Sequence, residues 1–275
     1  MKKALAKIHQ QLDALYPPGE LRELIRWMME EVVGIPPYRL LLLDDVLTDK
    51  QRLQIEAIVD RLAKKEPIQY ILGETTFCGL PFHVSRDVLI PRPETEQLVR
   101  LIVNDFSSCP SPRILDIGTG SGCIAISLAS LLPASCVTAL DISSSALQVA
   151  ADNATLNHVS VSWTCVDILS SEAESCLEQY DCIVSNPPYI MEHEQLEMDA
   201  SVLDYEPHKA LFVPDTDPLQ LAKSHLMAGG WLYFEINEQC GDAMLELLNS
   251  AGFSQTTIIK DYFGKDRMLK AQLVL

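Results

Sequence analysis

Residues 113–122 contain the feature that most limits how this chain can fold. Arg113–Ile117 carries the apolar residues Ile114, Leu115 and Ile117, which are typical of a buried strand, and a turn rich in glycine follows it directly. Ile124–Leu132 then continues as an apolar helix. A strand, a glycine turn and a helix in this order allow a ligand to approach the backbone at the start of the helix. The turn consists of Gly118, Thr119, Gly120, Ser121 and Gly122.

The spacing of these glycines bears on the kind of ligand. A dinucleotide-binding turn has glycine or alanine three residues after its second glycine, where this chain has Cys123. The third glycine, Gly122, comes earlier than that pattern requires. A Gly-x-Gly-x-Gly turn fits a ligand without a pyrophosphate, although the turn by itself is weak support for any ligand.

Two further predicted strands end at acidic residues. Cys136–Leu140 leads to Asp141, roughly 20 residues past the glycines, where a carboxylate can accept hydrogen bonds from both ribose hydroxyls of a nucleoside. Val161–Cys165 leads to Asp167, a candidate partner for an adenine amino group. Either aspartate could instead cap a helix or a turn. Since open parallel sheets bind ligands at the carboxyl ends of their strands, the three polar features together indicate a nucleoside site.

A fourth predicted strand, Cys182–Ser185, ends in the sequence Asn186-Pro187-Pro188-Tyr189. Each proline fixes φ and lacks an N–H, and a residue before proline adopts an extended conformation. The Asn186 side-chain oxygen and the Pro187 carbonyl can therefore both accept hydrogen bonds from one planar NH2 group, with Tyr189 packed on its face. Such a site suits an amide or an exocyclic amine. The alternative is an ordinary proline-rich turn.

The N-terminal part has a different texture. Between residue 2 and about residue 65, apolar residues recur at helical spacing in three stretches that proline and glycine separate. We therefore predict a helical bundle over 1–66 that binds a partner or supports the main domain. Residues 67–90 are predicted to link it, through a β-hairpin around Gly79, to an α/β domain over 91–275.

The start of that α/β domain has two interpretations. Pro91 and Pro93 stiffen a loop that precedes a helix running to about Phe106. Glu94 and Glu96 fall in the first turn of this helix, where carboxylates interact favourably with the helix dipole. Helix capping alone accounts for both glutamates. The alternative is that the loop borders the ligand site and that Arg92 or Glu94 positions a ligand.

Charge and composition narrow the classes of function. The formal net charge of −17 repels phosphate backbones, and the sequence has no long run of Lys or Arg. Between Glu172 and Asp217, acidic side chains far outnumber the one basic residue, Lys209, which favours a basic or neutral partner. Polar residues interrupt any N-terminal signal core, and no apolar run is long enough for a membrane span. The eight cysteines lack Cys-x-x-Cys spacing, so we expect a cytoplasmic protein without a metal site.

Taken together, these motifs resemble those of class I S-adenosylmethionine-dependent methyltransferases. The Asn-Pro-Pro-Tyr form is used by members that methylate planar NH2 nitrogens. Three more segments extend the likeness to the peptide chain release factor glutamine N5-methyltransferases, the PrmC or HemK family: Gln69–Gly73, Ile90–Glu96 and Asp204–Pro207. The resemblance covers essentially the whole chain, including the helical N-terminal part.

The resemblance implies a doubly wound, mostly parallel seven-stranded α/β sheet that ends in an antiparallel pair, here predicted at 254–260 and 268–275. It implies S-adenosylmethionine as cofactor, held by the glycine turn, Asp141, Asp167, Ile168 and Asn186. Ile168 stands where some members have tryptophan and would pack on the adenine. The substrate would be the glutamine of the Gly-Gly-Gln loop of release factors, bound by Asn186, Pro187, Pro188 and Tyr189. Catalysis would rest on Asn186, Pro187 and Tyr189, and the helical bundle would contact the release factor.

Two other classes of function remain to be distinguished. An adenine-N6 or guanine-N2 nucleic-acid methyltransferase would use the same four-residue site for an exocyclic amine, but the acidic charge and the missing target-recognition region disfavour it. A non-catalytic cofactor-binding protein would not require an intact Asn-Pro-Pro-Tyr sequence, which this chain has.

Overall fold

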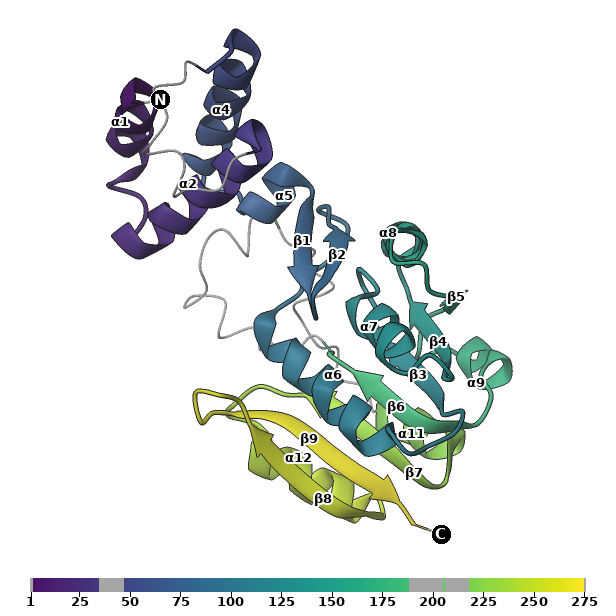
Figure 1. Ribbon diagram of the computed structural model, residues 1–275. Helices are drawn as coiled ribbons and strands as arrows, with labels where there is room; N and C mark the ends of the chain where they lie inside the picture. The colour runs from purple at the N-terminus through teal and green to yellow at the C-terminus, as the bar shows by residue number, and fades with distance from the viewer. Residues whose placement is uncertain (1, 35–46, 188–204, 206–217, 275) are drawn as a thin grey trace. The chain divides into compact units, whose positions relative to one another are not determined.

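The computed structural model describes residues 2–34, 47–187, 205 and 218–274, and Figure 1 shows the path of the chain. These residues form two compact units: the first contains the described residues up to Gly73 together with Tyr205, and the second contains the other described residues from Glu74 onward. The first unit is helical and the second is built on a large sheet.

The helical unit contains α1 (Lys2–Leu12), α2 (Pro18–Val33), α4 (Asp49–Leu62) and α5 (Ile68–Leu72). Helix α2 begins with Pro18, whose fixed φ suits the first helical position, and it ends at Gly34 with φ of 70°. Helix α4 begins with a capping box, in which Thr48 and Gln51 exchange hydrogen bonds between side chain and backbone. The apolar faces of these helices meet in one core, which includes Leu12, Leu21, Met28, Val59 and Leu62.

Arg61 connects α4 to α5 inside this unit. Its guanidinium donates two hydrogen bonds to the buried carboxylate of Glu66, at 2.7 and 2.8 Å, and a third to the Ile71 carbonyl at 3.1 Å. Paired donation to a carboxylate fixes direction as well as distance, so the short α5 is held at the end of α4.

The second unit contains a seven-stranded sheet in the order β5-β4-β3-β6-β7-β9-β8. Its first five strands pair in parallel, and β9 is antiparallel to both of its neighbours. This arrangement confirms the predicted mostly parallel sheet and the predicted C-terminal antiparallel pair. The strands are β3 (Arg113–Ile117), β4 (Cys136–Asp141), β5 (Ser162–Cys165), β6 (Tyr180–Ser185), β7 (Leu226–Glu235), β8 (Phe253–Lys260) and β9 (Asp266–Leu273).

Helices cover both faces of this sheet, as Figure 1 shows. Consecutive residues of β3 separate the two layers, because Ile114 belongs to one apolar core and Leu115 to the other. The first core includes residues of α6 (Pro93–Phe106), α7 (Cys123–Leu131) and α8 (Ser144–Leu156). The second includes residues of α9 (Ser171–Cys176), α11 (Pro218–His225) and α12 (Gly241–Ser250). The sheet is therefore doubly wound, as predicted.

Three local features are not evident from the sequence pattern. Helices α5 and α9 are short, and their periodicity is too brief to indicate a helix. Strand β7 begins at Leu226, directly after α11 (Pro218–His225) ends. The register against β6 shifts between Tyr180 and Cys182, so the early part of β7 pairs irregularly.

The predicted hairpin is present as β1 (Glu74–Phe77) and β2 (Leu80–His83), which pair antiparallel within the second unit. Asn153 of α8 connects it to the glycine turn. The Asn153 side chain accepts from the His83 N–H at 2.6 Å and donates to the carbonyls of His83 and Ser121, at 2.9 and 3.0 Å. Because Asn153 is fully buried, this one amide holds the hairpin, α8 and the turn together.

The substitution Asn153→Ala should lower the free energy of unfolding by about 2 kcal/mol, because it leaves backbone groups without partners in the interior. Asn157→Ala is the matched control. Asn157 also donates to a hairpin carbonyl, that of Pro81, but its contact is exposed and should contribute less than about 1 kcal/mol. Urea denaturation of both variants measures the difference. Equal losses would contradict the role given to Asn153.

Candidate active site

In-register pairing brings four strand ends to one edge of the sheet. Ile117 of β3 pairs with Leu140 of β4 and with Ser185 of β6. Asp141 of β4 in turn pairs with Cys165 of β5. Since these strands are parallel, the segments that follow them leave the sheet at the same edge. The glycine turn, Asp141, Asp167 and Asn186 all lie in or next to these segments.

The glycine turn is held at its start by β4. The Gly118 and Thr119 N–H groups both donate to the Leu140 carbonyl, at 2.9 and 3.0 Å. All three glycines have positive φ, a conformation that side chains disfavour. A Cβ at Gly122 would lie 2.8 Å from Ile126 Cδ1 and 3.1 Å from Ala150 Cβ, so a side chain here would also crowd its neighbours. A Cβ at Gly118 or Gly120 would meet no described protein atom within 4 Å, which leaves that surface of the turn clear for a ligand.

Asp141 supports the turn from the neighbouring strand. Its Oδ2 accepts from the Gly120 N–H and its Oδ1 from the Ser143 N–H, both at 2.9 Å. A carboxylate has about four acceptor positions, so each oxygen keeps the capacity for a further hydrogen bond. The capping interpretation of Asp141 is therefore correct, and it is compatible with binding two ribose hydroxyls.

Asp167 and Ile168 follow β5. Asp167 is exposed, and its Oδ1 accepts from the Leu169 N–H at 3.0 Å, which fixes the turn. Ile168 is half-buried and packs against the second apolar core. The structure thus places both residues beside the edge where Asp141 ends β4.

Asp116 is a buried carboxylate that we did not predict as a site residue. It is fully buried in β3, and its Oδ2 accepts from the Thr119 hydroxyl at 2.6 Å and from the Ala125 N–H at 3.2 Å. Its Oδ1 is buried and has no hydrogen-bond partner among the described residues. Burial raises the pKa of Asp116 to about 7, against the hydrogen bonds that favour the charged form. The signal in the sequence was a carboxylate inside an otherwise apolar strand.

Asn186 and Pro187 follow β6, and both are half-buried. The preceding Ser185 hydroxyl donates to the Ile117 carbonyl at 2.8 Å, which joins the ends of β6 and β3. Asn186 therefore directly follows a strand end that is joined to β3. Pro188 and Tyr189, the other two residues of the predicted substrate site, lie outside the described residues.

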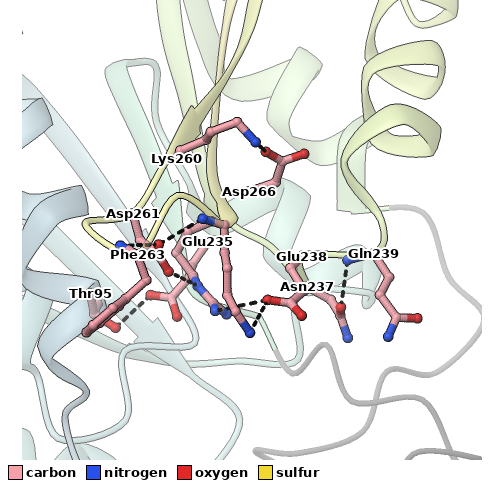
Figure 2. A network of polar contacts seen from close by, with 11 residues as sticks. Thr95, Glu235, Asn237, Glu238, Gln239, Lys260, Asp261, Phe263 and Asp266 are labelled. Atoms are coloured by element: carbon pink, nitrogen blue, oxygen red, sulfur yellow. Dashed lines mark hydrogen bonds and ion pairs between the residues drawn. The ribbon is translucent and has the colours of Figure 1, made fainter.

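Two residues that the sequence analysis does not identify as site residues are connected to this amide. Thr95 contacts it directly, and Glu235 is connected to it through the Thr95 hydroxyl. Asn186 Nδ2 donates to the Thr95 hydroxyl oxygen at 3.3 Å, and the Thr95 hydroxyl donates to Glu235 Oε2 at 2.6 Å. Both Thr95 and Glu235 are buried. Thr95 lies in the first turn of α6 and Glu235 ends β7, and Figure 2 shows these two side chains facing each other. With Asn186 after β6, three separate segments meet here.

The first turn of α6 contributes to the site through Thr95. Glu96 has a structural role, since it accepts from the Cys78 N–H of the hairpin at 2.9 Å and pairs with Arg100 at 3.1 Å. Arg92 is the N-cap residue of the helix, without a side-chain capping bond. Glu94 lies in the same turn. The loop therefore borders the edge of the sheet, while roles for Arg92 and Glu94 in positioning a ligand stay predictions.

Two family models match the chain. The model described as "Methyltransferase small domain" matches residues 94–262, and the model described as "PrmC N-terminal domain" matches residues 3–73. The first spans the glycine turn, the acidic strand ends and Asn186, and the second spans the helical unit.

Several curated proteins similar to this chain are named release factor glutamine methyltransferase. The protein from Flavobacterium psychrophilum is 44% identical over 95% of this chain and 95% of its own length. The protein from Bacteroides thetaiotaomicron is 44% identical over 98% of this chain and 99% of its own length. A relative from Lactococcus lactis is 40% identical over 84% of this chain and 86% of its length.

Solved structures share the fold at low identity. A 16S rRNA N2 methyltransferase from T. thermophilus has a TM-score of 0.53 and 17% identity, over 73% of this chain and 49% of that one. A methyltransferase from Pyrococcus furiosus has a TM-score of 0.50 and 19% identity, over 83% of this chain and 100% of that one. Both relate to the architecture of the sheet alone.

Among the described helices, none combines the length and apolar character that crossing a membrane requires.

The pKa of Asp116 predicts how stability depends on pH. A carboxyl whose pKa rises from 3.8 to about 7 on folding binds more protons in the folded state between these values. Its contribution to the free energy of unfolding therefore falls as pH rises from about 4 to about 7, by about 3 kcal/mol. Asp116→Asn should remove this slope, measured as the difference between variant and parent chain in denaturation series without cofactor. Parallel pH profiles would contradict the assignment.

Proposed function

The chain belongs to the family of release factor glutamine methyltransferases, and on this premise we propose that it methylates a glutamine in peptide chain release factors. It is a methyltransferase that uses S-adenosylmethionine, and the nitrogen of the glutamine side-chain amide, N5, is the acceptor. The acceptor glutamine lies in the Gly-Gly-Gln loop of the release factor. The reaction supports translation termination. The observation that carries the proposal is the half-buried Asn186 amide at the edge that also holds the glycine turn.

The residues at this edge fit S-adenosylmethionine. The clear surface of the turn at Gly118 and Gly120 allows a ligand to approach the backbone, as a nucleoside without a pyrophosphate would require. Asp141 retains acceptor capacity for ribose hydroxyls, and the exposed Asp167 can accept from an adenine amino group. Ile168 provides an apolar contact for the adenine. When bound, the cofactor supplies a methyl group that its sulfonium has already activated.

The chain's own part in the reaction is mainly alignment. An amide nitrogen is a poor nucleophile because its lone pair is shared with the carbonyl. The two N–H groups of the substrate amide would donate to the Asn186 side-chain oxygen and to the Pro187 carbonyl. The out-of-plane lobe of the amide nitrogen would then point toward the methyl group. These two acceptors also favour the positive charge that develops on nitrogen. Tyr189 would hold the plane by packing.

A strong base is not needed in this mechanism. The methylated nitrogen becomes very acidic and can lose its proton to water. The carboxylates described at this edge serve other purposes, since Asp141 and Asp167 accept backbone N–H groups and Glu235 accepts from Thr95. Asn186 and Pro187 are therefore the described residues that we assign to the substrate amide.

Nucleic acid is the less favoured substrate. An exocyclic amine of adenine or guanine would fit the same acceptors, but the chain has a net charge of −17. Phosphate contacts supply most non-specific affinity for nucleic acids, and the sequence has no long run of Lys or Arg to provide them. The helical unit, which matches the N-terminal family model, would instead contact the release factor.

The direct test uses methyl transfer from labelled S-adenosylmethionine to a purified bacterial release factor. A release factor with Gln→Ala in its Gly-Gly-Gln loop is the matched control. We expect label on the native protein alone, because only its glutamine offers a planar NH2 group at that loop. Equal label on both proteins, or label on duplex DNA or RNA at low salt, would refute the proposed acceptor.

Asn186→Ala should reduce kcat by about 100-fold to 1,000-fold, as loss of one preorganised hydrogen-bonding group at a reacting centre typically does. The Kd for S-adenosylmethionine, measured by calorimetry, should change little, because the glycine turn and Asp141 stay intact. Turnover close to that of the parent chain would contradict the mechanism. A parallel loss of cofactor binding would show that Asn186 acts mainly by holding the cofactor, as the resemblance also implies, and not by binding the substrate amide.

A further inference from the structure

A hydrogen-bonded series of three side chains ends at Asn186. Glu235 Oε2 accepts from the Thr95 hydroxyl at 2.6 Å, and the Thr95 oxygen accepts from Asn186 Nδ2 at 3.3 Å. Figure 2 shows the first of these bonds, at the end of β7. We propose that Thr95 and Glu235 are positioning residues that fix which end of the Asn186 amide faces the substrate. This inference rests on the proposed function, and it adds the residues that orient Asn186 Oδ1, the proposed hydrogen-bond acceptor for the substrate amide.

Counting hydrogens determines the direction of the series. The Thr95 hydroxyl has a single hydrogen, and it donates this hydrogen to Glu235 Oε2. The Thr95 oxygen then offers only lone pairs to Asn186. The side of the Asn186 amide that faces Thr95 must therefore be its NH2 group.

The same geometry sets the other end of the amide. The oxygen and nitrogen of an asparagine side chain diverge from one carbon, so an NH2 group directed at Thr95 turns Oδ1 away from it. The Oδ1 atom is then the end left for the substrate, where the proposed chemistry requires an acceptor. A reversed amide would present N–H groups to the N–H groups of the substrate, and the contact would be repulsive.

The carboxylate explains why threonine alone would not be enough. A lone hydroxyl can rotate and either donate to Asn186 or accept from it, which permits both amide orientations. Glu235 removes this freedom because it accepts strongly and is almost fully buried, at 1% exposure. Burial of a carboxylate is energetically costly, so the buried position of Glu235 next to Thr95 supports a specific role in the site.

The position of Thr95 is itself fixed. Its backbone N–H donates to the Arg92 carbonyl at 3.1 Å, and its side chain is 2% exposed. The next residue, Glu96, accepts from the Cys78 N–H of the hairpin. Hydrogen bonds on both sides of Thr95 thus fix the start of the helix that carries its hydroxyl. A positioning role requires such a fixed side chain.

The simpler alternative is that Thr95 and Glu235 only connect α6 to β7. The variants Thr95→Val and Thr95→Ser separate the two roles, since valine keeps the shape without the hydroxyl and serine keeps the hydroxyl. We expect kcat for methyl transfer to fall about 10-fold to 100-fold in Thr95→Val, the usual effect of losing a group that orients a site residue. Thr95→Ser should recover most of it. The Kd for S-adenosylmethionine should stay within about twofold in both.

A double-mutant cycle with Asn186→Ala provides the sharper test. If Thr95 acts through Asn186, Thr95→Val should cause no further loss of kcat in the Asn186→Ala background. Additive losses would show that Thr95 acts on the fold or the cofactor, and would overturn the proposal. A value of kcat in Thr95→Val equal to that of the parent chain, or a Thr95→Ser variant as slow as Thr95→Val, would overturn it as well.

Glu235→Gln tests the direction of the series. Glutamine has the same shape but can accept from Thr95 or donate to it, so the amide orientation is no longer enforced. We expect an intermediate loss of kcat. A rate equal to that of the parent chain would show that the carboxylate does not set the orientation.

A spectroscopic measurement separates this proposal from the proposed substrate. In the 15N-labelled protein, the side-chain NH2 signal that Asn186→Ala removes is assigned to Asn186. Slow hydrogen exchange of this group in the parent chain and in Thr95→Ser, and fast exchange in Thr95→Val, is the expected result. Equal exchange rates in all three would refute the positioning role, whether or not any release factor is methylated.

Discussion

The in-register parallel pairing of β3 with β4 and β6 is the constraint on which the rest of the site depends. Because Ile117 pairs with both Leu140 and Ser185, the segments after all three strands begin at one edge. A shift of one residue would reverse every side chain of a strand and remove its apolar residues from their cores. The two apolar cores, one on each face of the sheet, therefore fix the strand register and with it the positions of the segments that follow the strands.

Carboxylates at this edge share a common role as fixed acceptors. Asp141 accepts from the Gly120 N–H, Asp116 from the Thr119 hydroxyl, and Glu235 from the Thr95 hydroxyl. Each directs a donor of a neighbouring segment and so fixes the groups that face a ligand. Acidic residues in this chain thus organise the polar groups of the candidate site.

Local patterns made part of this structure predictable. The glycine turn, the acidic strand ends and the Asn-Pro-Pro-Tyr sequence each lie within a few residues of a strand whose apolar run is plain, so the fold class and the position of Asn186 followed. Thr95 and Glu235 did not, because their bond joins residues 140 positions apart and Asn186 lies 91 positions from Thr95. Asp116 lies within β3, whereas the predicted acidic site residues follow the apolar runs of their strands. The helices α5 and α9 are too short for periodicity to indicate them.

The most direct test of the central claim is to locate the methyl group. Tandem mass spectrometry of the release factor peptide that contains Gly-Gly-Gln, after incubation with the protein and S-adenosylmethionine, assigns the added mass to one residue. We expect one methyl group on the glutamine side-chain amide and none elsewhere. A methyl group on another residue, or an unmodified peptide with a protein that binds the cofactor, would contradict the assignment of Asn186 and Pro187 to a planar amide.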